Sequence, residues 1–277
     1  MALSVSTLDR LSSLERFVEE WPGPLGILLY VSEHDAYHNL DFIIRSSAIL
    51  SRKDIVRRLD VHLVYKRDGH NPINYMRNVL LNNSFADYNF YIDIDLIPNK
   101  GAYRSLQNMI KSNGNSIFLL PAFKSEIYLD EKLFPKNKGE LLKLIEKGSV
   151  NGIGVKSGWK LGHQPTNYSR WLTATEPYRA VFKDAFEPYV VAPKWLWARF
   201  NEDLMERMGD KIAYARLLHG LGFEFWVAPN DFIIHLPHIL SAGTKKYGLY
   251  PDMYRCGSVL FEKYRTDLNL LFPNVTF

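Results

Sequence analysis

Residues 89–98 read Asn-Phe-Tyr-Ile-Asp-Ile-Asp-Leu-Ile-Pro, an apolar run that carries two carboxylates. Its aromatic and β-branched residues, bounded by polar residues and Pro98, predict a short buried strand over residues 90–94. On a strand, Asp93 and Asp95 would project to the same face, because side chains alternate with a period of two. Two like charges at the end of an apolar strand need a positive partner. The run therefore predicts a site for a divalent cation that prefers oxygen ligands, Mn2+ or Mg2+.

The Asp-X-Asp pattern has three interpretations. The ordinary one is a pair of solvated acids that cap a strand and a turn. Aspartate-nucleophile phosphatases also place such a pair after a strand, but they need a threonine two residues beyond the second aspartate, where this chain has Ile97. In the third interpretation the cation also holds a diphosphate and supports transfer of a group away from it, as in nucleotide-sugar glycosyltransferases. The rest of the chain has to decide between the first and the third.

Helix and strand signals alternate over the first 125 residues. Strands are expected at 26–31, 61–65, 90–94 and 116–123, and helices at 6–21, 38–50, 73–81 and 103–111. This order predicts a parallel, Rossmann-like sheet. Ligands bind such sheets beyond the carboxyl ends of the strands, which is where Asp93 and Asp95 fall. The second half is rich in aromatic residues, with a helix expected at 211–219 and strands at 223–227 and 231–236.

Composition narrows the class of protein. With 277 residues, 47% of them hydrophobic, the chain can bury one large core, and no repeat or linker divides it. A net charge of +4 is too small to indicate nucleic-acid binding, although it suits an anionic donor such as a nucleotide diphosphate. The single cysteine, Cys256, excludes an internal disulfide. No apolar stretch approaches the ~20 residues of a membrane span, and no signal sequence is recognisable, so we expect a soluble chain.

Several further blocks occur in one order along the chain. They are Asn-Pro-Ile-Asn-Tyr-Met-Arg-Asn (71–78), Leu-Pro-Ala-Phe (120–123), Phe-Pro-Lys-Asn-Lys-Gly-Glu-Leu-Leu (134–142), Gly-His-Gln-Pro-Thr-Asn-Tyr-Ser-Arg-Trp (162–171), Thr-Ala-Thr-Glu-Pro-Tyr-Arg (173–179), Phe-Glu-Pro-Tyr-Val-Val (186–191) and Phe-Ile-Ile-His-Leu-Pro-His (232–238). Together with the Asp-X-Asp run they resemble glycosyltransferase family 49 over roughly residues 20–240. Within that family they are most similar to the C-terminal catalytic domain of the LARGE enzymes.

The resemblance implies an α/β protein with a GT-A glycosyltransferase fold. A Rossmann-like nucleotide-sugar-binding half (22–125) would merge with an acceptor half (126–240), followed by a tail (241–277), in a single catalytic domain. It also implies an inverting, Mn2+-dependent enzyme, with Mg2+ as the alternative ion, that moves a sugar from a UDP-sugar donor to a glycan or glycoprotein acceptor. Glucuronic acid is the expected sugar. The alternative is an inactive transferase-fold protein that binds glycan or nucleotide without turnover.

The resemblance also assigns residues to the metal and the donor. Asp93, Asp95 and His235 are the expected metal ligands, since neutral imidazole is a good Mn2+ ligand. His238, in the same block, is interpreted as an ordinary hydrogen-bonded histidine. Expected donor contacts are Asn74, Arg77, Asp93 and Lys245. A guanidinium can bind phosphate or carboxylate in a forked geometry, whereas Lys245 with Lys246 is explained equally well as a surface pair.

An inverting transfer needs a general base that takes the proton from the acceptor hydroxyl. The candidates, in order of preference, are Glu187, Asp184 and Asp210. The ordinary interpretation of Glu187 is a buried carboxylate that pairs with Arg179 or Arg170.

One segment departs from the family pattern. Between Trp195 and Lys211 the gap is longer than usual, and a Gly-Tyr-Gly-Trp motif is lost, so the acceptor and even activity are in question. Localisation follows only from the resemblance, which implies the Golgi or secretory-pathway lumen; without a visible signal or anchor, the cytoplasm is the alternative. Glycosylation sequons at Asn82, Asn167 and Asn274 permit a lumenal protein.

Overall fold

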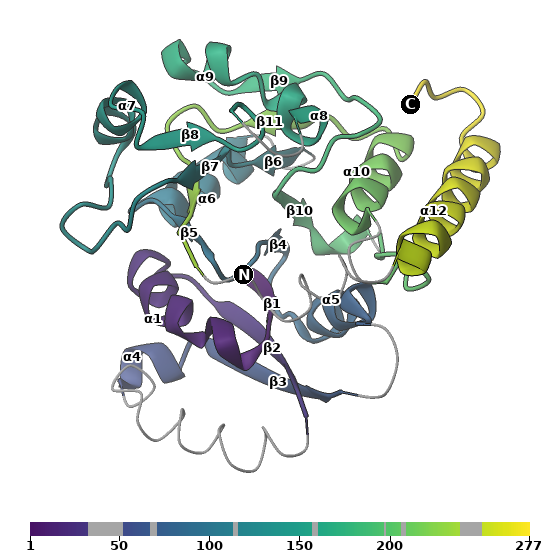
Figure 1. Ribbon diagram of the computed structural model, residues 1–277, viewed down its shortest axis with the longest axis horizontal. Helices are drawn as coiled ribbons and strands as arrows, with labels where there is room; N and C mark the ends of the chain where they lie inside the picture. The colour runs from purple at the N-terminus through teal and green to yellow at the C-terminus, as the bar shows by residue number, and fades with distance from the viewer. Residues whose placement is uncertain are drawn as a thin grey trace.

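The computed structural model describes residues 1–32, 52–66, 71–112, 116–156, 160–196, 198–205, 209–238 and 251–277. The helix expected at 38–50 and the two lysines at 245 and 246 lie outside these ranges. Figure 1 shows strands at the centre of the molecule with helices around them, and the last helix at the periphery beside α10.

Strands from both halves of the chain form the larger sheet. Its order is β3-β2-β1-β4-β10-β6-β11-β9. The bounds are β1 (Ala2–Ser6), β2 (Leu25–Val31), β3 (Leu59–Tyr65), β4 (Tyr88–Tyr91), β6 (Ile117–Leu119), β9 (Tyr178–Ala180), β10 (Val190–Pro193) and β11 (Phe225–Val227). The first four strands in this order run parallel; β2, β3 and β4 correspond to predicted strands of a parallel sheet, whereas β1 was not predicted. β10 enters antiparallel between β4 and β6, so the complete sheet is mixed.

A smaller sheet lies beside the first. Its order is β5-β12-β7-β8, with bounds β5 (Leu96–Pro98), β7 (Ala122–Ser125), β8 (Val150–Gly152) and β12 (Ile233–His235). The strand predicted over 116–123 is divided at Leu120-Pro121, where proline cannot donate to a ladder, so β6 and β7 join different sheets. β12 pairs antiparallel with β5, and this register places His235 opposite Leu96, next to Asp95.

Helices cover the sheets. They are α1 (Leu11–Glu20), α4 (Lys53–Val56), α5 (Ile73–Asn83), α6 (Ala102–Ser112), α7 (Lys138–Glu146), α8 (Lys160–His163), α9 (Tyr168–Thr173), α10 (Asp210–Gly220) and α12 (Pro251–Leu271), with 3-10 turns η1 (Leu8–Arg10), η3 (Gln164–Thr166) and η4 (Lys194–Leu196). The predicted start of the first helix at Ser6 is wrong, because residues 2–6 form β1 at the centre of the sheet. Buried Phe17 and Trp21 of the α1 region and Met76 and Leu80 of α5 fill the core.

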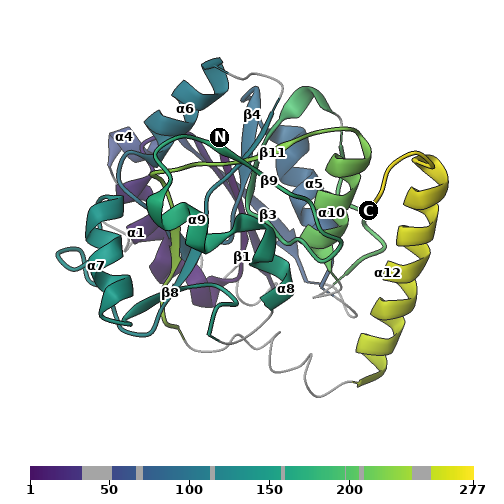
Figure 2. The same ribbon diagram turned by 90° about the horizontal axis from the view of Figure 1, so that it is seen from above.

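The long C-terminal helix α12 packs on α10 and forms the outer edge of the molecule. Figure 2, seen from above, shows α10 between the sheet and α12. A Cβ on Gly209 would lie 2.8 Å from the Phe261 ring, and one on Gly220 would lie 2.5 Å from the Phe272 ring. The two helices therefore approach closely at both ends of α10. Within the described ranges, α12 and the other helices lack the length and apolarity that a membrane crossing requires.

Candidate active site

The Asp-X-Asp pair lies in a turn and not on a strand, which corrects the sequence prediction. β4 ends at Tyr91, and the turn is closed by a hydrogen bond from the Leu96 N–H to the Asp93 carbonyl, 3.0 Å long. The period-two argument therefore does not hold at these positions. The two carboxylates meet different partners: Asp93 meets cations from α5 and α10, and Asp95 meets histidines at the end of β12.

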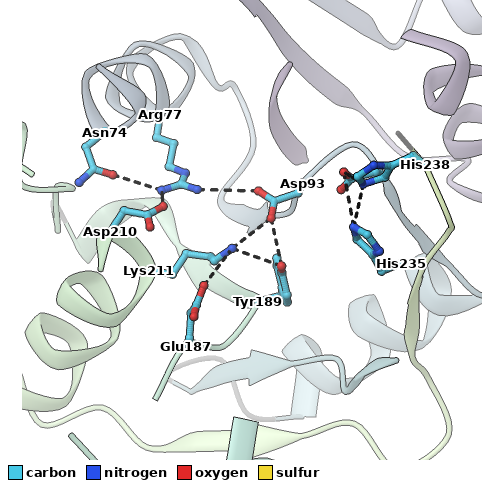
Figure 3. A network of polar contacts seen from close by, with 10 residues as sticks. Asn74, Arg77, Asp93, Glu187, Tyr189, Asp210, Lys211, His235 and His238 are labelled. Carbon is cyan, nitrogen blue, oxygen red and sulfur yellow. Dashed lines mark hydrogen bonds and ion pairs between the residues drawn. The ribbon is translucent and has the colours of Figure 1, made fainter. Parts of the chain in front are cut away.

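Asp93 is held by the protein itself. Its Oδ2 accepts hydrogen bonds from Lys211 Nζ and from the Tyr189 hydroxyl, each at 3.0 Å, and Arg77 Nη2 lies 3.8 Å from Oδ1. These contacts are drawn in Figure 3. Arg77 comes from the first turns of α5 and Lys211 from the first turn of α10, which begins after Gly209 in the left-handed conformation (φ 74°). Helix starts from two parts of the chain thus converge on one carboxylate.

The charge states of Asp93 and Lys211 follow from the groups around them. Burial alone would raise the pKa of Asp93, but Lys211 and Arg77 outweigh it and hold that pKa well below its ordinary value. For Lys211, burial is likewise outweighed by Asp93 and the other acidic groups around it, so its pKa lies well above the ordinary value. Lys211 is therefore a permanent cation, and Asp93 a permanent anion, over the physiological range.

Asp95 has a different environment. His238 Nε2 lies 2.8 Å and His235 Nε2 3.6 Å from Asp95 Oδ2, and the two imidazole nitrogens lie 3.0 Å apart. Figure 3 shows both rings directed to one point, to the side of the Asp93 group. One ligand atom from each of the three side chains lies within 4.8 Å of the others. Two imidazole nitrogens at this separation either share a proton or face a common cation.

The donor set fits a divalent cation such as Mn2+. It combines one carboxylate with two imidazoles, and first-row divalent ions accept both ligand types. Burial would raise the pKa of Asp95, but the hydrogen bond and charge of His235 and His238 lower it, so the ligand is available in its ionised form. His235 Nδ1 is buried and has no hydrogen-bond partner in the described part of the chain.

The charges of the site do not cancel. Among the described residues, four carboxylates face two side-chain cations, which leaves a deficit of two positive charges (Asp93, Asp95, Glu187 and Asp210 against Arg77 and Lys211). Like charges gathered at a partly buried site are unfavourable unless a counter-charge is supplied. One divalent cation would balance them.

The three candidate bases lie in unequal positions. Glu187 Oε1 lies 3.3 Å from Lys211 Nζ, and burial raises the pKa of Glu187 despite that cation. Asp210 pairs with Arg77, which outweighs burial and lowers the pKa of Asp210. Asp184 forms ion pairs with Arg216 of α10 and Arg265 of α12.

The structure therefore brings Glu187 and Asp210 to the Asp93 group, while Asp184 faces α12. Arg179, suggested as an ordinary partner of Glu187, pairs with Glu224 instead. Asn74 is fully buried: its amide donates to the Asn201 carbonyl at 2.7 Å, and its Oδ1 accepts a hydrogen bond from Arg77 at 3.2 Å. Asn74 thus orients Arg77.

Two residues of the site were not singled out from the sequence, and a third was set aside. Lys211 is adjacent to the candidate Asp210, at the start of a predicted helix, but a lysine there is ordinarily solvated. Tyr189 lies in the Phe-Glu-Pro-Tyr block, two residues after Glu187, and on a strand the two would share a face. His238, interpreted as an ordinary histidine, lies closer to Asp95 than His235 does.

Comparison with known proteins identifies the family. Residues 66–246 match the family described as "Glycosyl-transferase for dystroglycan". The chain belongs to this family. It is 33% identical over 267 residues to the xylosyl- and glucuronyltransferase LARGE2s of Gallus gallus, which covers 95% of this chain and 35% of that protein. It is 32% identical over 267 residues to the LARGE1 protein of Homo sapiens of the same description, covering 95% and 34%. The chain thus spans about a third of the length of these curated relatives.

A solved structure establishes the fold class. The crystal structure of GalNAc-T7 with UDP, GalNAc and Mn2+ superposes with a TM-score of 0.57 and 11% sequence identity, covering 97% of this chain and 54% of that one. At this identity the likeness concerns the fold alone. The GT-A fold expected from the sequence is confirmed.

The segment that departs from the family pattern is firmly attached to the site. Asn78 of α5 donates to the Phe200 carbonyl at 2.9 Å and accepts from the Phe200 N–H at 3.0 Å. The Phe200 ring stacks on Tyr214 with centroids 4.0 Å apart, and the Arg77 guanidinium lies over the Phe200 ring, 5.2 Å from its centroid. Phe200, in the described part of the altered segment, therefore packs between α5 and α10.

Proposed function

We propose that this chain is an Mn2+-dependent, inverting glycosyltransferase that moves a sugar, glucuronic acid, from a UDP-sugar donor to a glycan acceptor, within a single GT-A domain. The observation that carries the proposal is the convergence of Asp95, His235 and His238 beside a second carboxylate whose charge is already compensated. This geometry suits one divalent ion and the diphosphate of a nucleotide sugar. Mg2+ is the alternative ion.

The metal ligands would be Asp95 and His235, as the sequence predicts, together with His238. When bound, the ion would supply the positive charge that stabilises the diphosphate leaving group. Of the two roles predicted for Asp93, donor contact fits its surroundings better than metal ligation, since both of its oxygens already face protein cations or a hydroxyl. Asp93 is nevertheless 40% exposed at its side chain, so it can accept a further hydrogen bond from the donor.

Arg77 and Lys211 would keep two positive charges next to the donor throughout the reaction. Arg77 is held by Asn74 and Asp210, and Lys211 by Asp93 and Glu187, so both are fixed before any ligand arrives. Charges fixed in advance need no reorganisation when negative charge develops on the leaving group. We also keep Lys245 as a proposed donor contact on sequence grounds alone.

Glu187 is the proposed general base. Its raised pKa makes it a better proton acceptor than Asp210, whose pKa is lowered by Arg77. Lys211 would stabilise the carboxylate form and orient it. Asp184, with two arginines on its carboxylate, suits a structural role better.

The donor sugar and the place of action rest on the relatives. Proteins named xylosyl- and glucuronyltransferases are about a third identical to this chain, which supports glucuronic acid as the transferred sugar and a glycan or glycoprotein as the acceptor. A lumenal location in the secretory pathway would follow from the same relationship. The competing function is a protein that binds nucleotide or glycan without turnover, which the altered segment before Lys211 would favour.

A UDP-release screen tests the proposal. The protein is incubated with a panel of UDP-sugars and xylose-terminated or other glycan acceptors, with Mn2+, with Mg2+ or with a chelator. We expect release that depends on acceptor and Mn2+ and is highest with UDP-glucuronic acid. Highest release with another sugar would overturn the donor assignment. Mn2+-dependent UDP binding without release from any donor and acceptor pair would support the non-catalytic alternative.

A further inference from the structure

Asp184 joins three separate elements of the chain. It lies in the segment between β9 and β10, three residues before Glu187. Its Oδ1 pairs with Arg216 of α10, and its Oδ2 lies 2.6 Å from Arg265 Nη2 of α12. Arg216 is almost fully buried, at 2% side-chain exposure, and also donates to Asn269 Oδ1 of α12 at 2.8 Å. One carboxylate therefore connects the β9–β10 segment to both helices.

The segment between Asp184 and Glu187 is short and held at several points. The Phe186 N–H donates to the Lys183 carbonyl at 2.9 Å, which forms a turn, and the Glu187 N–H donates to the Gly162 carbonyl at 2.8 Å. Phe186 is fully buried and packs against Phe225 with ring centroids 5.6 Å apart. Asp184 lies inside the turn that the Lys183–Phe186 hydrogen bond closes, so its ion pairs and these contacts together hold the chain that leads to Glu187.

The other end of this connection also reaches the site. Arg216 lies on α10, the helix whose first turn carries Asp210 and Lys211. Because α12 packs closely at both ends of α10, it restrains that helix and, through Arg265, the segment that carries Glu187. The outer helix thus contacts both the helix that carries Lys211 and the segment that carries Glu187.

We propose that Arg265 and Asp184 are positioning residues through which α12 fixes Glu187 for the acceptor. The inference rests on the proposed function, in which Glu187 is the base. A base misplaced by about 1 Å can lose a hundredfold in rate without any change in donor binding. Arg265 and Asp184 are 32% and 39% exposed at their side chains, so their ion pair contributes little to stability. Loss of this ion pair should therefore lower kcat/KM for the acceptor while changing the stability of the fold little.

The test compares Arg265→Ala and Arg265→Lys with Arg255→Ala. Arg255 lies on the same helix, is 83% exposed and pairs only loosely with Asp252, at 3.8 Å, which makes it a matched control. We expect Arg265→Ala to lower kcat/KM for the acceptor by about tenfold to a hundredfold, Arg265→Lys to recover part of it, and the control to change nothing. Mn2+-dependent UDP binding and Tm should stay near the wild-type values, within about 4 °C for Tm.

Two further measurements separate positioning from a general loss of structure. Arg265→Ala combined with Asp184→Asn should lower acceptor use no further than Asp184→Asn alone, because Asp184→Asn already removes the ion pair that Arg265→Ala breaks. Hydrogen exchange of residues 182–189 should accelerate in Arg265→Ala and not in Arg255→Ala. Equal losses in UDP binding and acceptor use, or unchanged exchange, would overturn the proposal. Accelerated exchange in a protein whose wild type transfers no sugar would instead overturn the proposed function and leave α12 as a restraint on this segment.

Discussion

The two aspartates of one short motif occupy opposite kinds of environment. Asp93 is surrounded by permanent cations, Lys211 and Arg77, which come from the starts of two helices. Asp95, two residues later, has the imidazoles of His235 and His238 as its ion-pair partners among the described residues, and these carry no charge unless protonated. The difference arises from the turn between β4 and β5, which directs the two carboxylates apart.

The contrast suggests that the two aspartates have different roles, Asp93 in orienting the donor and Asp95 in binding the ion. The Asp93 side has its positive charge supplied by Lys211 and Arg77 in advance, so it can orient a donor and, through Lys211, the proposed base Glu187. The Asp95 side lacks a fixed cation among its described contacts and offers the ligand types that a divalent ion accepts. Variants on each side should therefore fail in different assays.

Glu187→Gln should produce the largest effect, confined to chemistry on the Asp93 side. The amide keeps the shape of the side chain but cannot accept the acceptor proton, so transfer should fall by about a hundredfold to ten-thousandfold. Isothermal titration should show UDP and Mn2+ binding unchanged. Full transfer in this variant would move the role of base to Asp210 or Asp184. Equal losses of binding and transfer would indicate a structural carboxylate.

Asp95→Asn and Asp93→Asn are a matched pair of variants that tests directly whether the two carboxylates have different roles. We expect Asp95→Asn to weaken Mn2+ binding by more than about a hundredfold, since even the partners of metal ligands are worth about tenfold to a hundredfold. Asp93→Asn should weaken it by less than about tenfold while impairing donor binding. Titration of Mn2+ with each purified variant, without donor, provides the measurement. Similar losses in the two variants would show that both carboxylates bind the ion.

Lys211→Met should destabilise the protein, because it leaves Asp93 and Glu187 without their shared cation. Breaking a buried pair costs about 3–5 kcal/mol, but Asp93 is 40% exposed, so we expect about 1–3 kcal/mol. Urea unfolding at neutral pH, with Arg255→Ala as the surface control, measures this difference. A stability equal to that of the wild type would mean that solvent already compensates Asp93.

The pH profile should show the smallest effect. Only deprotonated Glu187 can accept a proton, and burial raises its pKa above 4.5, so kcat/KM for the acceptor should fall as the pH drops through that raised value. Removal of the Lys211 charge should move the acid limb to higher pH, because that cation lowers the pKa of Glu187. The profile is recorded with saturating Mn2+, since protons also compete for histidine ligands. An acid limb that stays in place without Lys211 would assign it to another group.

Local patterns predicted much of this architecture from the sequence. Helices α5, α6 and α10 and strands β2 and β3 match their predictions to within about two residues, because amphipathic or apolar runs with clear ends specify them. Strand β1 was missed, since its residues precede a stronger helical pattern and only pairing between β2 and β4 reveals it. The strand predicted over 90–94 is displaced toward the C-terminus, since β4 covers Tyr88–Tyr91. The apolar run continues into the turn that carries Asp93 and Asp95, and hydrophobicity alone does not show where the strand ends.

The candidate site was predicted in its parts but not in its pairing. The motifs named Asp95, His235, Arg77 and Glu187, which the structure brings together. They did not show that Lys211 and Tyr189 would contact Asp93, because these residues lie about a hundred positions away from it in the sequence. They also did not show that Asp184 would pair with Arg265, because α12 carries no recognised motif. Tertiary pairing of charges is the information that a single sequence lacks.

Pulsed electron paramagnetic resonance of the Mn2+-loaded protein tests whether His235 and His238 bind the ion, because it detects nitrogen ligands without any need for activity. We expect nitrogen couplings from two histidines in the wild type, from one histidine in His235→Ala and in His238→Ala, and from two in Asp93→Asn. Bound Mn2+ that shows no histidine nitrogen, or couplings that survive both histidine substitutions, would contradict the assignment of the ion to Asp95, His235 and His238.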